Sequence, residues 1–222
     1  MTGLFRRLKR ARSGVAMTEF ALALPLLLTA GMWGAETINL TVTNMRISQL
    51  AMQIADNASR IGDQSALVDR KIYEADVNDL LAGAQIQAGQ LHLFDRGRVI
   101  ISSLEVVPGT AGQQYIHWQR CRGTKHVVSA YGGEGKGLDG SLTGMGPPGE
   151  EVSASAGDAV MYVEISYDYQ PLIANVFTGS NAPRTIQTTA AFNVRDDRDL
   201  TQIYQRDAMK PDTVAGCNAY TA

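Results

Sequence analysis

The sequence is poor in the residues that build catalytic and metal sites. Its 222 residues include only three histidines, His92, His117 and His126, and two cysteines, Cys121 and Cys217. The histidines do not show the spacing of a zinc motif, and neither cysteine belongs to a Cys-x-x-Cys pair. Nucleophile motifs such as Gly-x-Ser-x-Gly are missing as well. We therefore predict no catalytic residues, no metal ligands and no cofactor, and we expect that the protein is not an enzyme.

Two glycine motifs suggest a different chemistry, because 135–140 and 144–149 both spell Gly-x-Gly-x-x-Gly. A dinucleotide site needs a strand before this motif and a helix that begins within it. Both copies lie instead in residues 132–157, which contain nine glycines and the pair Pro147-Pro148. This composition predicts a long flexible loop with almost nothing to bury.

Basic residues gather at one end of the chain. The first 14 residues carry a charge of +5 with no acidic residue, whereas residues 15–222 carry −7. The basic block does not continue beyond this point, which argues against a nucleic-acid-binding surface. A short basic block directly before an apolar run is typical of the cytoplasmic flank of a membrane helix. We therefore expect the chain beyond about residue 36 to lie outside the cytoplasm.

The apolar run itself is long enough to cross a bilayer. Val15–Ala35 contains one charged residue, Glu19, and 21 residues span about 30 Å at about 1.5 Å per residue. We predict a transmembrane helix over 15–36, in which Pro25 introduces a kink that a bilayer helix tolerates. A cleaved secretory signal is the alternative. Glu19 argues against that alternative, since the apolar core of such a signal gains nothing from a charge.

Helical periodicity continues beyond the apolar run. Over 37–62 the apolar residues recur at spacings of three, four and seven, which predicts an amphipathic continuation of the same helix. The two segments then form one rod of about 45 residues, which ends at the sequence Gly62-Asp63-Gln64-Ser65.

Residues 63–222 predict a small exported α+β domain with an antiparallel sheet packed on helices. Ser65 is the expected N-cap of a second helix, whose apolar residues include Leu67, Ile72, Tyr73, Val77, Leu80 and Leu81. After Gly83 the pattern changes to one typical of strands. The expected strands are Gln90–Phe94, Arg98–Val107, Gln113–Arg122, Val160–Tyr169 and Arg184–Val194, with a hairpin turn at Asp95-Arg96-Gly97.

The end of the chain is polar. Arg195–Asp199 is expected to be a solvated charge cluster, and little in the tail after Lys210 is suited to burial. Outside the cytoplasm, Cys121 and Cys217 can form a disulfide that holds the tail on the sheet. Two unrelated buried thiols are the alternative.

The order of features at the N-terminus resembles a known signal. A basic block, Gly14, four residues, Glu19, the aromatic Phe20 and an apolar helix are similar to the class III signal of type IV-like prepilins. The closest resemblance is to the TadE-like pseudopilin, or minor pilin, family of the tight-adherence (Flp-type) pilus. The sequence Tyr167-Asp168-Tyr169-Gln170-Pro171, followed by a Thr-rich strand, is also similar to the exported part of that family. Flp-type signals favour tyrosine where this chain has Phe20.

The resemblance implies a structural role in pilus assembly. A prepilin peptidase would cleave between Gly14 and Val15, and Glu19 would pair with the new α-amine of Val15 on a neighbouring subunit. The expected partners are other pilins, the inner-membrane assembly machinery, the peptidase and membrane lipid, without nucleic acid or small-molecule substrate. The expected location is the bacterial inner membrane, as a single-pass protein with its C-terminal domain outside the cytoplasm. The alternatives are a tethered extracytoplasmic binding module with an uncleaved anchor and an exported enzyme.

Overall fold

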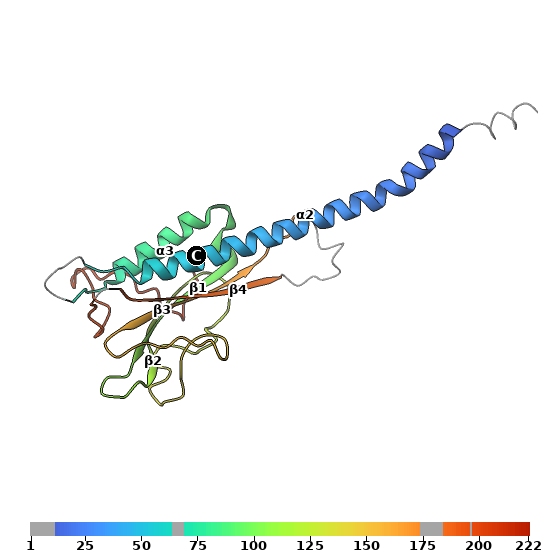
Figure 1. The fold of residues 1–222 in the computed structure, drawn as a ribbon. Coiled ribbons are helices and arrows are strands. Elements are labelled where there is room, and N and C mark those ends of the chain that lie inside the picture. Colours follow the sequence, from blue (N-terminus) through green and yellow to red (C-terminus); the bar gives the residue numbers. More distant parts are fainter. Residues whose placement is uncertain (1–11, 64–68, 174–183, 196) are drawn as a thin grey trace, which may run out of the picture. The chain divides into compact units, whose positions relative to one another are not determined.

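The computed structural model describes residues 12–63, 69–173, 184–195 and 197–222 (Figure 1). They fold as two units. One contains helix α2 (Arg12–Ala58) as far as Val42, together with the segment that begins at Pro171; the other contains Thr43–Gln170 and the chain from Pro183 onward. The architecture is α+β with a long apolar N-terminal helix and an antiparallel sheet, as the sequence predicts, but the sheet has four strands instead of five.

Helix α2 is continuous through Pro25 and extends over 47 residues. Every residue from Gly14 to Ala35 is exposed, whereas the part after Thr43 buries one face. That face consists of residues at helical spacing that are at most 4% exposed: Ile47, Leu50, Ala51, Ile54, Ala55 and Ala58. A helix that is apolar all round in one half and amphipathic in the other suits two different surroundings.

The C-terminal end of α2 is capped by a residue from far along the chain. Arg198 is 7% exposed, and its Nη2 donates to the carbonyl oxygens of Ile61 at 2.9 Å and Ala58 at 3.3 Å. The last carbonyls of a helix have no partner within it, so a buried helix end needs such donors. The prediction that 195–199 forms a solvated cluster is therefore wrong for Arg198. Arg195 remains exposed and pairs with Asp56 at 3.3 Å.

The second helix begins later than predicted. Helix α3 (Glu74–Ala88) starts after Tyr73, whose backbone N–H donates to Asp76 Oδ2 at 3.1 Å. The expected cap at Ser65 lies outside the described residues, and Ile72 and Tyr73 precede the helix rather than belonging to it. A carboxylate in the first turn that satisfies an N-terminal N–H explains why the helix begins at this point.

The strand predicted over Gln90–Phe94 is wrong, and so is the change to strand after Gly83. Helix α3 continues to Ala88 and is followed by a 3-10 turn, η1 (Gly89–Leu91), and a short helix, α4 (Leu93–Arg96). The neighbours Leu93 and Phe94 are both at most 1% exposed. Successive strand residues point to opposite faces, whereas neighbours in a helical turn can both reach one core. Gly97 consequently opens a strand instead of closing a hairpin turn.

The sheet has the order β2-β1-β3-β4 with every pair antiparallel. Its strands, each within two residues of a predicted one at either end, are β1 (Gly97–Val106), β2 (Gln114–Arg122), β3 (Ala159–Asp168) and β4 (Thr185–Asn193). Residues on one face are identified from the register, since Cα partners on neighbouring strands share a face. Ile100, for example, is the partner of both Cys121 and Glu164.

Helices cover one face of this sheet (Figure 1). Thr188 Oγ1 on β4 contacts Ser48 Oγ on α2 at 3.4 Å, and Arg120 on β2 forms an ion pair with the buried Glu74 at the start of α3. Their register partners Ile165 and Ile101 belong to the same face and are at most 1% exposed. The main core therefore lies between α2, α3 and this face.

The opposite face is covered by the glycine-rich segment. Met145 is completely buried in a second apolar core, which also contains Leu104, Ile116, Ala154, Val160 and Tyr162. Met145 and Val152 form a bridge in which each N–H donates to the other's carbonyl, at 3.0 and 2.9 Å. The prediction that 132–157 has almost nothing to bury is therefore wrong. The segment has no helix or longer strand, but Met145 and Ala154 belong to the second core, and Leu142 and Val152 pack against it.

This second core leads to a stability prediction. Met145→Ala should lower the free energy of unfolding by about 2–5 kcal/mol, the usual cost of truncating a fully buried methionine. Met209→Ala is the matched control, because Met209 is 95% exposed and should change stability by less than about 0.5 kcal/mol. Urea unfolding of both variants measures the difference. Equal stabilities would mean that the glycine-rich segment contributes no core.

The C-terminal tail is held on the same face. Cys121 and Cys217 form a disulfide that links positions 96 residues apart. Backbone bonds support it, since the N–H of Cys121 donates to Ala215 O and that of Gly123 donates to Thr221 O, both at 2.8 Å. The tail is thereby attached to the end of β2, as the sequence suggests for a disulfide.

Candidate functional site

The exposed apolar part of α2 is the most unusual surface of the molecule. Its large side chains include Met17 at 73% exposure, Leu22 at 75%, Leu26 at 72% and Trp33 at 77%. A continuous apolar surface of this length is unfavourable in water and marks a membrane or protein interface. Among the described residues, this is the one helix long and apolar enough to cross a membrane.

The threonine hydroxyls of this segment are satisfied inside the helix. Thr18 donates to Val15 O at 2.8 Å, Thr29 donates to Pro25 O at 2.9 Å, and Thr37 donates to Trp33 O at 2.9 Å. Hydrocarbon provides no hydrogen-bond partner, so a bilayer helix must satisfy its polar groups internally. These hydroxyls are compatible with a lipid environment.

Glu19 is different from these threonines. Its side chain is exposed and has no hydrogen-bond or ion-pair partner among the residues whose side chains the structure describes. Gly14, Val15, Glu19 and Phe20, which the sequence singles out, all lie in the first turns of α2. Val15 and Glu19 are one turn apart on one face, separated by about 6 Å along the axis. The segment thus presents one unpaired carboxylate beside the proposed new N-terminus.

A second acidic residue marks the other end of the apolar segment. Glu36 Oε2 accepts hydrogen bonds from the backbone N–H groups of Leu172 at 2.9 Å and Ile173 at 3.2 Å, all within the first unit. Leu172 is 66% exposed. Glu36 is therefore engaged by the loop after β3, whereas Glu19 is not engaged.

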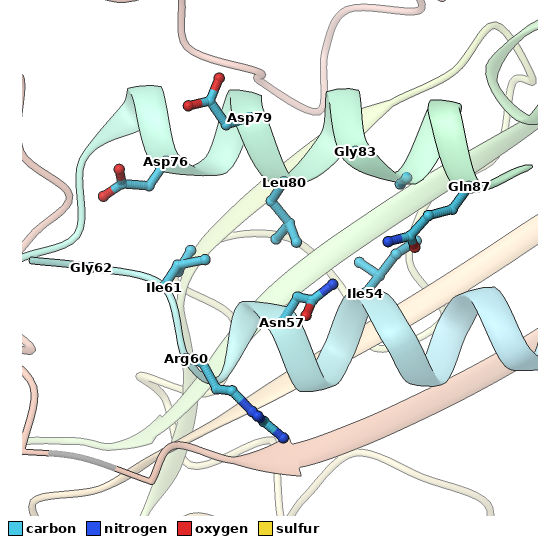
Figure 2. A pocket seen from close by; sticks show the side chains of 11 residues that line it. Ile54, Asn57, Arg60, Ile61, Gly62, Asp76, Asp79, Leu80, Gly83 and Gln87 are labelled. Carbon is cyan, nitrogen blue, oxygen red and sulfur yellow. The ribbon is translucent and has the colours of Figure 1, made fainter.

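A groove of about 420 Å³ lies between the end of α2 and α3 (Figure 2). Ile54 and Leu80 point into it from the two helices, whereas Asp79 points away. Its charged residues have partners elsewhere, since Arg60 pairs with Asp56 at 2.7 Å and Asp76 pairs with Arg206 at 2.5 Å. Both Arg60 and Asp76 are thus neutralised by neighbouring charges.

The three histidines lie apart and have different neighbours. His92 lies 3.5 Å from Asp95, His117 lies 2.9 Å from Glu105, and His126 stacks on Tyr220 with ring centroids 4.1 Å apart. Within the described part of the chain, no group of three or more His, Cys, Asp or Glu residues could hold a metal ion. The histidines serve in pairing and packing.

The His117–Glu105 pair predicts a pH dependence of stability. The hydrogen bond to Glu105 raises the pKa of His117, with burial acting in the opposite direction. A raised histidine pKa stabilises the fold fully below the unfolded value of about 6.5 and loses that stabilisation as pH rises through the folded pKa. Melting temperatures measured across this window should fall for the wild type, and this fall should be smaller for His117→Gln. An identical pH profile for both proteins would show that the pair does not titrate in this range.

Comparisons with protein-family models, with curated proteins and with solved structures give no match to this chain.

Proposed function

We propose that this protein is a minor pilin or pseudopilin, a non-enzymatic structural subunit for the assembly of a tight-adherence pilus. The observation that carries the proposal is the exposed apolar half of α2, with Glu19 as its one unpaired carboxylate after a basic block and Gly14. A membrane anchor alone needs no such charge.

The physical reason concerns the cost of a charge in hydrocarbon. A carboxylate within an apolar membrane helix is expensive and is retained when it has a partner. Cleavage between Gly14 and Val15 would remove the basic block and leave a free α-amine at the start of the helix. Pairing of that amine with Glu19 of a neighbouring subunit would offset both desolvation costs and define the axial register between subunits.

The proposal includes a location and a set of partners. The protein would be held in the inner membrane by α2, with its sheet domain outside the cytoplasm, before it joins other pilins. The membrane interior and the contact with other pilins would both provide an apolar environment for the exposed half of α2. The disulfide fits an oxidising compartment.

A tethered binding module with an intact N-terminus is the second candidate. A cavity on the sheet, whose lining includes Arg98 and Glu164, favours it because such a cavity can hold a small ligand. N-terminal sequencing of the membrane-extracted protein separates the candidates. Val15 as the first residue supports the pseudopilin, Met1 supports the tethered module, and a start near 31–36 indicates a secretory signal.

Processing provides a direct test. We expect Gly14→Val to leave an uncleaved, slower-migrating precursor in the membrane, since the peptidase accepts a residue without a side chain before the scissile bond. Gly31→Val is the matched control, because a Cβ at either glycine meets no atom within 4 Å and both lie on α2. Immunoblotting should show normal mobility for Gly31→Val. A Gly14→Val variant that is processed like the wild type would contradict the class III signal.

A further inference from the structure

A short segment after β3 is attached to α2 at the point where the apolar run ends. Glu36 directly follows Ala35, the last residue of that run. Glu36 Oε2 accepts hydrogen bonds from the backbone N–H groups of Leu172 at 2.9 Å and Ile173 at 3.2 Å. These residues belong to the first unit, which contains the apolar part of α2 and the segment that begins at Pro171. The position of Glu36 along α2 therefore determines where Leu172 and Ile173 lie.

The exposure of α2 changes at the same level. Every residue from Gly14 to Ala35 is exposed, whereas Glu36, Asn39 and Leu40 are half-buried. Residues three and four positions apart lie on one side of a helix. Glu36 is the residue that bonds to the segment, so the segment lies on this side of α2.

Trp33 indicates where the surface of a bilayer would cross this helix. It is 77% exposed, and tryptophan is enriched at the boundary between membrane and water. Glu36 comes three residues later, which is about 4.5 Å along the axis at about 1.5 Å per residue. The headgroup regions add about 10–15 Å to a hydrocarbon core of about 30 Å, so each is about 5–7 Å thick. When α2 spans the membrane, the segment bonded to Glu36 lies at the depth of the headgroups.

The side chains of the segment suit that depth. Leu172 is 66% exposed, which is nearly the same as Leu27 in the apolar run at 67%. A single exposed leucine is common on protein surfaces and by itself indicates nothing. This leucine, however, is attached to the end of a long apolar helix surface and extends it, and such surfaces mark sites of interaction.

The hydrogen bonds to Glu36 also suit a membrane surface. Backbone N–H groups that leave water need partners inside the protein, and those of Leu172 and Ile173 have the Glu36 carboxylate. The carboxylate in turn receives two charge-assisted hydrogen bonds, which partly replace its hydration. The arrangement lowers the cost of placing both the loop backbone and the acidic side chain among lipid headgroups.

We propose that Leu172 and Ile173 insert into the headgroup region of the outer leaflet beside α2, and that Glu36 holds them there. The partner of this surface is lipid, and the chain then contacts the membrane through α2 and through this segment. Interfacial anchors determine the tilt and rotation of a membrane helix, so the second contact would restrict both. The inference rests on the membrane anchor of the proposed function, but not on cleavage after Gly14 or on assembly into a pilus.

Fluorescence of the full chain in vesicles of phosphatidylethanolamine and phosphatidylglycerol tests the proposal. An environment-sensitive dye on Leu172→Cys reports on the segment, because the two native cysteines are paired in a disulfide. Leu26→Cys, at a position 72% exposed in the apolar run, is the control for lipid contact. Leu138→Cys, at a position 56% exposed in the second unit, is the control for water. The quenchers are nitroxide-labelled lipids in the bilayer and iodide in the buffer.

The three positions distinguish the possible results. We expect lipid quenching at 26 and 172, with the nitroxide near the headgroup most effective at 172, and iodide quenching at 138. Lipid quenching at 26 together with iodide quenching at 172 would overturn this inference and leave the membrane anchor intact. Protection from both quenchers at 172 would indicate contact with protein in place of lipid and would overturn it as well. Absence of lipid quenching at 26 would refute the anchor itself, and this inference with it.

The role of Glu36 is tested by further variants of the labelled Leu172→Cys protein. Glu36→Ala removes the acceptor of both N–H groups, and Glu36→Gln retains one oxygen acceptor. Glu150→Ala is the matched control at an exposed position in the second unit. We expect iodide quenching at 172 to rise in Glu36→Ala, to rise less in Glu36→Gln and to stay unchanged in Glu150→Ala. Equal quenching with and without Glu36→Ala would show that lipid contact does not depend on Glu36 and would refute its role.

Discussion

Removal of the Cys121–Cys217 disulfide should lower the free energy of unfolding by about 4–5 kcal/mol, because a cross-link restricts the conformations of the unfolded chain. The bond joins residues 96 positions apart, so the loop it closes is long and the entropy lost by the unfolded chain is correspondingly large. Typical domains are stable by only about 5–15 kcal/mol, and this loss would be a major part of the total.

The native state should also change locally. The carbonyls of Cys217 and Ala219 accept hydrogen bonds from Arg98 at 2.6 and 3.0 Å, and the guanidinium carbon lies 4.1 Å from the centroid of the Tyr220 ring. If the tail leaves, the buried guanidinium loses most of its partners. We therefore expect the tail and the Arg98 side of the sheet to become more accessible together.

The double variant Cys121→Ser/Cys217→Ser is the suitable test, because it leaves no free thiol to form wrong bonds. Urea unfolding gives the free energy, and limited proteolysis reports release of the tail. The wild type under reducing conditions is the control and should match the double variant. A loss below about 1 kcal/mol with a protected tail would show that backbone and cation–π contacts hold the tail without the disulfide.

The strands were predictable because their side chains alternate. In β3, Tyr162, Glu164 and Ser166 alternate with Val163 and Ile165, and this period of two identifies a strand without any tertiary information. Alternation gives the wrong result over Gln90–Phe94. There the neighbours Leu93 and Phe94 are both buried, as a helical turn allows and a strand with one buried face does not. Short apolar runs do not distinguish a strand from a helical turn, since both can supply two or three buried residues.

The cover of the second sheet face was not predictable from composition. Glycine and proline content in 132–157 indicates the absence of regular structure, but it does not indicate whether the chain packs. The segment contains few apolar residues, and in the sequence Met145 and Leu142 look like the occasional apolar residues of a solvated loop. Their role depends on an uncovered apolar sheet face, which includes Leu104 and Val160 and is known only once the register is known.

The two candidate sites differ in the same way. Gly14 and Glu19 are adjacent in sequence within one helix, so a local pattern suffices to identify them. The cavity needs Arg98, Glu164 and the segment 127–131 from three distant parts of the chain. The one local signal was the polar pair Glu164 and Ser166 on the same face of an otherwise apolar strand, which requires a reason for burial.

Glu19→Ala should abolish pilus assembly and leave the exported domain intact. Glu19 lies on the exposed half of α2, in a different unit from the sheet, so its loss removes no contact from either core. Insertion becomes easier because a charge leaves an apolar helix. The variant lacks the counter-charge for the α-amine of Val15 on an adjacent subunit. An unpaired ammonium group in hydrocarbon is costly, so it opposes the packing of neighbouring subunits.

We therefore expect normal abundance in the membrane, normal cleavage after Gly14, an unchanged melting temperature, and loss of co-purification with other pilins. Thr18→Ala is the matched control, since Thr18 is the exposed neighbour and its hydroxyl bonds only to Val15 O. Glu19→Gln separates charge from shape, because it retains the size of the side chain and should fail like alanine. Assembly of Glu19→Ala at the wild-type level would make the carboxylate incidental. The tethered binding module, with its cavity at Glu164, would then be the better account of the protein.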